Sequence, residues 1–141
     1  MGYRLNIFFD VDGTILGEDG TLRPYTRHVF EHLIGAGHRI YIWSGIGIRT
    51  ADIHGVGLHD LVSGIYVKPL FEFVATLKRY QIPVVPDFVI DDHPRIVEHF
   101  GGMLVKRYEL ADDSDTELLA VPGLVARLAR AQAAANRRQD V

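Results

Sequence analysis

Apolar and polar residues alternate along the chain in blocks that predict strands and helices in turn. Short apolar blocks typical of strands buried on both faces lie at 5–9, 38–43, 61–67, 88–90 and 103–105. Helical spacing of apolar residues predicts helices at 25–35, 48–54, 68–80, 95–100 and 122–138. Strands that alternate with helices predict an α/β fold of three layers with a five-stranded, mainly parallel sheet.

The same spacing predicts which helical side chains face the core. In 25–35 the inward positions are Val29, Phe30, Leu33 and Ile34, and in 68–80 the stripe contains Phe71, Val74, Leu77 and Lys78. Between the first strand and the first helix, residues 16–22 are rich in glycine and acids, and Asp19-Gly20 suits a tight turn. We expect this segment to form a small flap.

Composition limits the classes of protein that the chain can belong to. Its 141 residues fit one domain, 1–141, whose last helix, 122–138, we expect to fray at its end. A net charge of -3 gives no general case for a nucleic-acid or membrane partner. Without cysteine, thiol nucleophiles and zinc-thiolate sites are excluded. No signal sequence or stretch of about 20 apolar residues is recognisable, so we expect a cytoplasmic protein.

The segment FFDVDGT, residues 8–14, places two acids at the end of the first strand. In extended backbone the side chains of Asp10 and Asp12 leave on the same side, because they are two residues apart. Carboxylates at the end of a buried strand are costly without a partner, and a divalent cation would be one. A solvated polar turn explains Asp-Val-Asp-Gly equally well when the segment is taken alone.

Three further strands end in residues with related chemistry. Ligands of parallel sheets bind where the carboxyl ends of the strands converge. The side chains brought to that edge are Asp10, Asp12, Ser44, Lys68, Asp91 and Asp92. Carboxylates suit Mg²⁺, one acid could attack phosphorus while the second exchanges protons, and the hydroxyl and ammonium groups could bind phosphoryl oxygens.

These four strand ends resemble, in order, the four motifs of the haloacid dehalogenase-like (HAD) hydrolase superfamily. FFDVDGT resembles the first motif, Asp-x-Asp-Gly-Thr after a hydrophobic strand, and IYIWSG resembles the second. VKP is similar to the third, a lysine before a helix, and FVIDDHP to the fourth, an acidic pair after a strand. The resemblance implies a Rossmann-like α/β/α fold and hydrolase chemistry.

The resemblance also implies a role for each matching residue. Asp10 would be the nucleophile and a metal ligand, and Asp12 the general acid and base, with its backbone carbonyl on Mg²⁺. Ser44 and the Gly45 amide would bind phosphate, and Lys68 would orient the nucleophile and neutralise charge. Asp92 would bind Mg²⁺ directly and Asp91 through water. An acid at position 12 favours phosphatase or phosphotransferase chemistry over dehalogenation.

The intervals between the motifs have no room for the cap domain that many members of the superfamily carry. Residues 15–43 must supply the flap, a helix and a strand, and residues 45–67 a short helix and a strand. We therefore expect an open site that takes a small phosphorylated metabolite or the phosphorylated end of a macromolecule. A neighbouring copy in a homo-oligomer could cover it.

Two other functions fit parts of the pattern. A phospho-receiver domain also groups acids, a hydroxyl and a lysine, but an Asp should end its third strand, and none does here. A catalytically idle binding module of the same fold is the other alternative. His28 and His32 lack a third convergent ligand for zinc. His93, beside the acidic pair, could act in the site, and the entry of a helix explains it nearly as well. The arginines of 122–138 could contact an anionic partner, but they fit a solvated helix face better.

Overall fold

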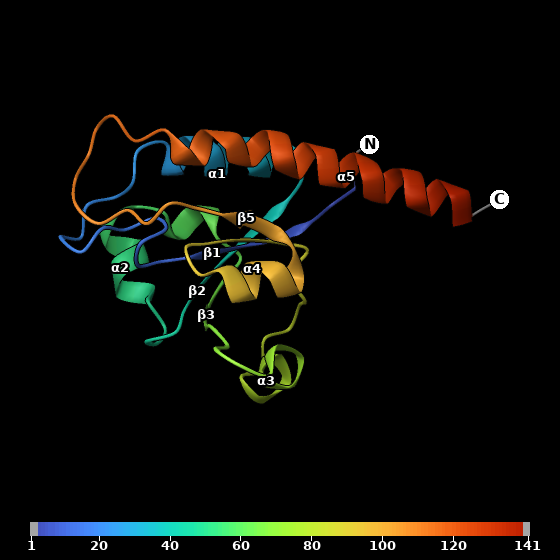
Figure 1. The fold of residues 1–141 in the computed structure, drawn as a ribbon, viewed down its shortest axis with the longest axis horizontal. Helices are drawn as coiled ribbons and strands as arrows, with labels where there is room; N and C mark the ends of the chain where they lie inside the picture. Colours follow the sequence, from blue (N-terminus) through green and yellow to red (C-terminus); the bar gives the residue numbers. More distant parts are fainter. Residues whose placement is uncertain (1–2, 140–141) are drawn as a thin grey trace.

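The computed structural model describes residues 3–139 and contains one five-stranded sheet (Figure 1). The strand order is β3-β2-β1-β4-β5, and every neighbouring pair is parallel. The strands are β1 (Asn6–Asp10), β2 (Arg39–Ser44), β3 (Gly64–Val67), β4 (Phe88–Asp91) and β5 (Gly102–Leu104). The predicted parallel α/β architecture is confirmed.

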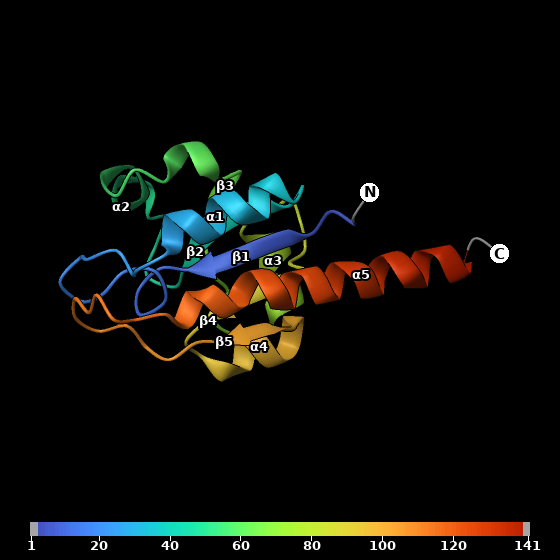
Figure 2. The ribbon, with the colours of Figure 1, turned by 90° about the horizontal axis from the view of Figure 1, so that it is seen from above.

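Helices cover both faces of the sheet, which gives three layers (Figures 1 and 2). Helices α1 and α5 lie on one face, whereas α3 and α4 lie on the other. The α-helices are α1 (Thr26–Gly35), α2 (Thr50–Gly55), α3 (Phe73–Arg79), α4 (Pro94–Phe100) and α5 (Val121–Gln139). Single 3₁₀ turns form η1 (His59–Leu61) and η2 (Glu117–Ala120).

Alternating side chains of β1 enter two separate hydrophobic cores. Ile7 and Phe9 pack with the apolar faces of α1 and α5, whereas Phe8 packs on the opposite face among Tyr41 and Trp43. All five side chains are buried. Burial on both faces explains why β1 is apolar without alternation, as is typical of a central parallel strand.

The register of the strands aligns their carboxyl ends. Asp10 is paired with Trp43, one residue before Ser44, and Phe9 is paired with Ile90, one residue before Asp91. Ser44 in turn is opposite Val67, which precedes Lys68. The parallel register therefore brings four of the sequence-predicted site residues to one edge of the sheet.

Some predicted boundaries and core faces were wrong. Leu61 belongs to η1, and β3 begins only at Gly64. The helix predicted from Lys68 begins at Phe73, because Pro69 disfavours helical backbone at the residue before it. Glu72, with a φ of 45°, lies in the left-handed region immediately before that helix.

The side chains that α3 and the residues before it bury also differ from the prediction. Phe71 and Val74, predicted to face inward, are each 58% exposed, whereas Leu77 is buried as predicted. Ile34 of α1 is 38% exposed because α1 packs through Val29, Phe30 and Leu33. In both helices a narrower stripe than predicted makes contact with the sheet.

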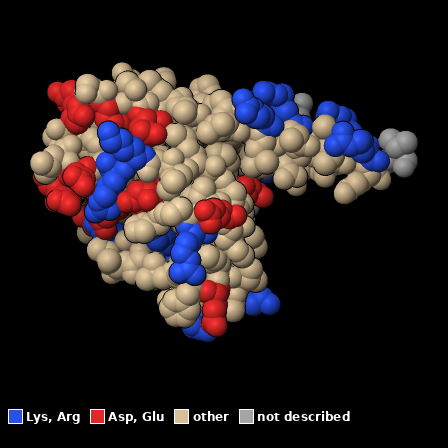
Figure 3. All heavy atoms as spheres, in the orientation of Figure 1, with Lys and Arg blue, Asp and Glu red and all other residues tan. Residues whose placement is uncertain are grey.

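Helix α5 packs against α1 and β5 and then continues past the sheet (Figure 2). Val121, Val125 and Ala129 are its buried side chains. By length and composition alone, the helical stretch Glu117–Gln139 would suffice to cross a membrane, although 22% of its most apolar window is buried in the protein. Basic side chains follow the protruding part (Figure 3), and Arg127, Arg130, Arg137 and Arg138 are exposed, as predicted for a solvated face.

Candidate active site

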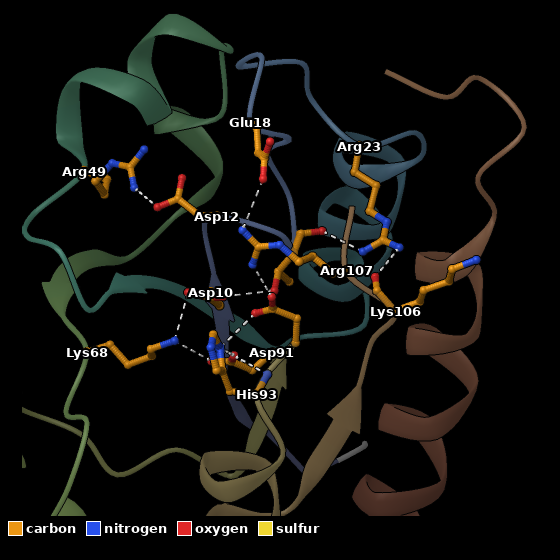
Figure 4. A network of polar contacts seen from close by, with 12 residues as sticks. Asp10, Asp12, Glu18, Arg23, Arg49, Lys68, Asp91, His93, Lys106 and Arg107 are labelled. Atoms are coloured by element: carbon orange, nitrogen blue, oxygen red, sulfur yellow. Dashed lines mark hydrogen bonds and ion pairs between the residues drawn. The ribbon is translucent and has the colours of Figure 1, made fainter. Parts of the chain in front are cut away.

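Asp10 ends β1 and points into a buried cluster of polar groups (Figure 4). The strand stops here because Gly13 turns the backbone with a φ of 82°, a conformation that side-chain-bearing residues rarely adopt. Within this turn Thr14 donates a hydrogen bond from Oγ1 to Oδ2 of Asp10 at 3.1 Å. The residue is only 3% exposed, so its carboxylate depends on protein groups for stabilisation.

Lys68 supplies the cation that this carboxylate needs. Its Nζ lies 3.1 Å from Oδ1 of Asp10 and 3.0 Å from Oδ2 of Asp91. The backbone N–H of Lys68 donates to the carbonyl of Ser44 at 2.9 Å, which fixes the start of the β3–α3 loop beside β2. A single ammonium group thus bridges acids from two different strands.

The acidic pair after β4 divides between two environments. Asp91 is fully buried and, besides Lys68, accepts a hydrogen bond from the backbone N–H of His93 at 2.9 Å. Asp92 is held at 2.7 Å by Nη1 of Arg107. Nδ1 of His93 lies 3.1 Å from Oδ1 of Asp92. Asp91 therefore orients Lys68, whereas Asp92 faces Asp10 and Arg107.

Burial and crowding shift the pKa values of the charged groups. Burial, followed by the nearby charge of Asp91, raises the pKa of Asp10 to about 8, although Lys68 opposes the shift. Burial alone would lower the pKa of Lys68, but Asp10 and Asp91 together raise it above its usual value. The pKa of Asp92 is lowered: burial opposes this, but hydrogen bonds with Asp10 and Arg107 outweigh it. The raised pKa keeps the Lys68 ammonium group charged while it contacts both Asp10 and Asp91.

A group of potential metal ligands lies at the centre of this network. Carboxylate oxygens of Asp10, Asp91 and Asp92 and a ring nitrogen of His93 all lie within 4.8 Å of one another. Within residues 3–139, Oδ1 of Asp92 is a buried oxygen that accepts no hydrogen bond. Buried oxygens normally find a partner, and clustered carboxylates are the donors that a hard divalent cation prefers. The cluster fits such a cation.

Ser44 and Gly45 form the neighbouring wall of the crevice. Ser44 ends β2 and is 2% exposed, and its Oγ accepts a hydrogen bond of 3.4 Å from the N–H of Ile46. A side chain at Gly45 would require Leu70 to move, because an added Cβ would lie 2.8 Å from its Cδ2. These residues line a cavity of about 210 Å³ that also contains Asp10, Asp12 and Lys68.

The carboxylate of Asp12 lies apart from the metal-ligand group. It is 43% exposed and pairs with Nη1 of Arg49 at 2.5 Å. The side chains of Asp10 and Asp12 therefore reach different parts of the same crevice. A metal contact through the backbone carbonyl of Asp12 stays a prediction.

Two arginines of this crevice were missed by the sequence analysis. Arg49 follows Ser44 by five residues, in the loop before α2, and Arg107 follows β5. Neither loop has a periodic pattern, and both arginines approach the acids only through the tertiary fold. The best available signal was position, since each arginine lies shortly after the carboxyl end of a parallel strand.

The predicted flap is present and is fixed to the segment that carries Arg107. Leu16 forms an antiparallel bridge with Leu22, which closes the flap, and the N–H of Glu18 donates to the carbonyl of Glu109 at 2.6 Å. The N–H of Tyr108 donates to the carbonyl of Gly13 at 2.8 Å. The segments on either side of β2 hold no cap domain in the part of the chain that the structure describes. One contains the flap and α1, the other α2 and η1.

Comparison with known proteins identifies a family model and a solved structure that are similar to this chain. The model of the haloacid dehalogenase-like hydrolases matches residues 7–53, which contain the turn after β1, all of β2 and Arg49. The fold is similar to the crystal structure of an uncharacterized protein from Listeria monocytogenes serotype 4b. That similarity has a TM-score of 0.62 at 15% identity and covers 88% of this chain and 98% of the other. A search of curated proteins found no match.

Proposed function

We propose that the chain is a Mg²⁺-dependent phosphohydrolase of the haloacid dehalogenase-like superfamily, whose family model matches residues 7–53, and that it acts through a phosphorylated Asp10. The observation that carries this proposal is the bridge of Lys68 between Asp10 and Asp91, beside Oδ1 of Asp92, a buried oxygen that accepts no hydrogen bond within residues 3–139. A solvated polar turn would not bury its first acid against a lysine from a distant strand.

The metal-ligand group fits Mg²⁺, with Asp10 and Asp92 as direct ligands. Asp91 already accepts hydrogen bonds from Lys68 and His93, so it would contribute through water. When bound, Mg²⁺ would offset the repulsion among these acids and the charge of an incoming phosphate. We assign the backbone carbonyl of Asp12 as a further ligand.

Asp10 is suited to act as the nucleophile. Lys68 and Thr14 each contact a different oxygen of its carboxylate, so the side chain is held in one orientation. One carboxylate oxygen attacks phosphorus, and the bond from phosphorus to the leaving oxygen breaks. Ser44, the amide of Gly45 and Lys68 bind the phosphoryl oxygens as their charge grows.

Asp12 is suited to proton transfer because its carboxylate lies at the exposed side of the crevice. It donates a proton to the leaving oxygen as the ester bond breaks. It then removes a proton from the water that attacks the phosphorus of phospho-Asp10. The bond between phosphorus and Asp10 breaks, which releases inorganic phosphate and regenerates the carboxylate of Asp10.

The substrate is a phosphorylated molecule whose leaving group extends out of an open crevice. Ile46 and Leu70 line the cavity and are 79% and 58% exposed, so the mouth has no lid formed by the described residues. An open mouth admits a small phosphorylated metabolite or the phosphorylated end of a macromolecule.

The test is hydrolysis of an aryl phosphate with Mg²⁺ or with a chelator. We expect turnover with Mg²⁺, none with the chelator, and a loss of at least ~10³-fold in Asp10→Asn, which removes the nucleophile. Asp113→Asn, the same change on an exposed loop, is the matched control and retains activity. Full activity in Asp10→Asn would exclude the nucleophile, and Mg²⁺ binding without turnover of any phosphate ester would favour a binding module.

A further inference from the structure

The guanidinium of Arg49 points toward Asp12 at one side of the crevice (Figure 4). Its Nη1 is 2.5 Å from Oδ2 of Asp12 and 3.4 Å from Oγ of Ser44. In the proposed reaction Asp12 is the proton donor and Ser44 binds the phosphate. A guanidinium nitrogen within reach of both also lies within reach of a phosphoryl oxygen bound between them.

A second acid, Asp52, holds the guanidinium of Arg49 through Nε rather than Nη1. Oδ2 of Asp52 accepts a hydrogen bond from Nε of Arg49 at 2.6 Å. The side chain of Arg49 is only 16% exposed. Fixing Nε turns the Nη1 edge toward Ser44, so the arginine is oriented before any ligand binds. The exposed pair of Arg79 with Glu72, at 3.9 Å, shows no comparable restraint.

The balance of charges in the crevice favours a further cation beside a bound phosphate. Asp10, Asp12, Asp91 and Asp92 carry four carboxylates, and Lys68 is the ammonium group buried among them. Lys68, Arg107 beside Asp92 and a divalent cation would together balance these carboxylates, so the charge of an entering phosphate dianion would be left uncompensated. A fixed guanidinium at the Ser44 wall offsets part of that charge where the phosphoryl oxygens bind.

We propose that Arg49 is a phosphate ligand of this site. In the absence of substrate its Nη1 pairs with Asp12, and in its presence Nη1 donates to a non-bridging phosphoryl oxygen. The exchange leaves the carboxylate of Asp12 available for proton transfer. Asp52 is the positioning residue, and the inference rests on the proposed function for the identity of the ligand as a phosphate group.

The exchange has the space it needs. Arg49, Asp12 and Asp52 line a second cavity of about 650 Å³ that adjoins the catalytic cavity through Asp12 and Ile46. The guanidinium can therefore shift toward a bound phosphate without displacing the backbone. The leaving group of the substrate would enter the same space.

The proposal is tested by measuring the binding of inorganic phosphate to the full chain by calorimetry in the presence of Mg²⁺. We expect Arg49→Gln to raise Kd at least ~10-fold, Arg49→Lys to raise it less, and Asp52→Asn to fall between the intact chain and Arg49→Gln. Arg79→Gln, an exposed arginine with an acidic partner, is the matched control and leaves Kd unchanged. A melting temperature measured in parallel separates this effect from loss of folding.

The outcomes distinguish this inference from the proposed function. If the intact chain hydrolyses aryl phosphate but Arg49→Gln binds phosphate as tightly as the intact chain, the role of Arg49 is overturned and the function stands. If the intact chain turns over no ester yet binds phosphate through Arg49, the inference stands and the function fails. If the intact chain binds no phosphate, the inference is overturned.

Discussion

At the scale of single residues, Lys68 holds the buried charges of the site together. Replacing it with methionine keeps the length of the side chain but leaves Asp10 and Asp91 facing each other without a cation. We expect the free energy of unfolding to fall by roughly 3–5 kcal/mol, the cost of removing one partner from a buried ion pair. Urea unfolding in chelator measures it.

The matched control for Lys68→Met is Lys78→Met, because Lys78 is exposed on α3. It should cost less than about 0.5 kcal/mol, as is usual for surface substitutions. Added Mg²⁺ should restore part of the stability lost in Lys68→Met, since it replaces the missing positive charge. Equal, small losses in both variants would contradict the bridging role of Lys68.

Asp10 predicts how the stability of the metal-free protein depends on pH. Its pKa is 3.8 without perturbation and about 8 in the fold, so between these values the folded chain holds a proton that the unfolded chain has released. The unfolding free energy must then decrease as pH rises through this window. Relative to Asp10→Asn, which cannot titrate, the intact chain should lose stability steadily toward pH 8.

Chemical denaturation in chelator at several pH values within that window gives the comparison. The difference between the intact chain and Asp10→Asn isolates the carboxylate, because the other titrating groups are common to both. His38 is one of these groups, and burial lowers its pKa, so on its own it adds stability as pH rises. A difference that is constant or grows in favour of the intact chain would contradict the raised pKa of Asp10.

The convergence of Asp10, Ser44, Lys68 and the acidic pair was predictable, because parallel strands deliver their carboxyl ends to one edge. The direction of each carboxylate was not. Asp12 turns to Arg49 rather than to the metal-ligand group, and sequence spacing does not encode that partner. Arg49 approaches the site by way of a loop whose path depends on the tertiary fold.

At the scale of elements, Arg23 joins the turn after β1 to the segment that follows β5. Its side chain is fully buried, and its Nη1 and Nη2 donate to the carbonyls of Thr14 and Lys106 at 3.2 and 2.7 Å. Nε pairs with Asp115 at 2.9 Å, and the guanidinium carbon lies 5.3 Å from the centre of the Tyr108 ring. The position of Arg107 over Asp92 depends on this connection.

Arg23→Met should therefore destabilise the protein and loosen residues 106–115. We expect a loss of roughly 3 kcal/mol, because buried carbonyls lose their donors and Asp115 loses its partner. Urea unfolding measures the loss, and limited proteolysis within 106–115 reports the loosening. Arg127→Met on the exposed face of α5 is the control. A loss no larger than that of the control would show that Arg23 is not needed for the connection.

Strands were easier to predict than the connections between them. The block at 88–90 predicted β4 within one residue, because burial on both faces leaves an uninterrupted apolar run. The segment after Lys68 was misread as helix, since Phe71 and Val74 have helical spacing with Leu77 but lie on the surface. Leu70, in the same segment, is apolar and lines the cavity of the site rather than the core.

At the scale of the whole molecule, the fold separates the site from the stabilising cores. The two cores lie on opposite faces of the sheet, and the crevice lies at the carboxyl edge of its strands. The layered arrangement followed from the alternation of elements in the sequence. The extent to which α5 continues past the sheet did not, because an alanine-rich helix has nearly the same pattern in contact with the fold or beyond it (Figure 1).

The most direct test of the whole account is to trap the phosphorylated enzyme. The intact chain is mixed with Mg²⁺ and an aryl phosphate labelled on phosphorus, quenched in acid during turnover, and mapped by peptide mass spectrometry. We predict an acid-stable, base-labile label on Asp10 that is absent from Asp10→Asn and accumulates in Asp12→Asn, where attack by water is slowed. Turnover with the label on another residue, or turnover that persists in Asp10→Asn without any label, would contradict the account.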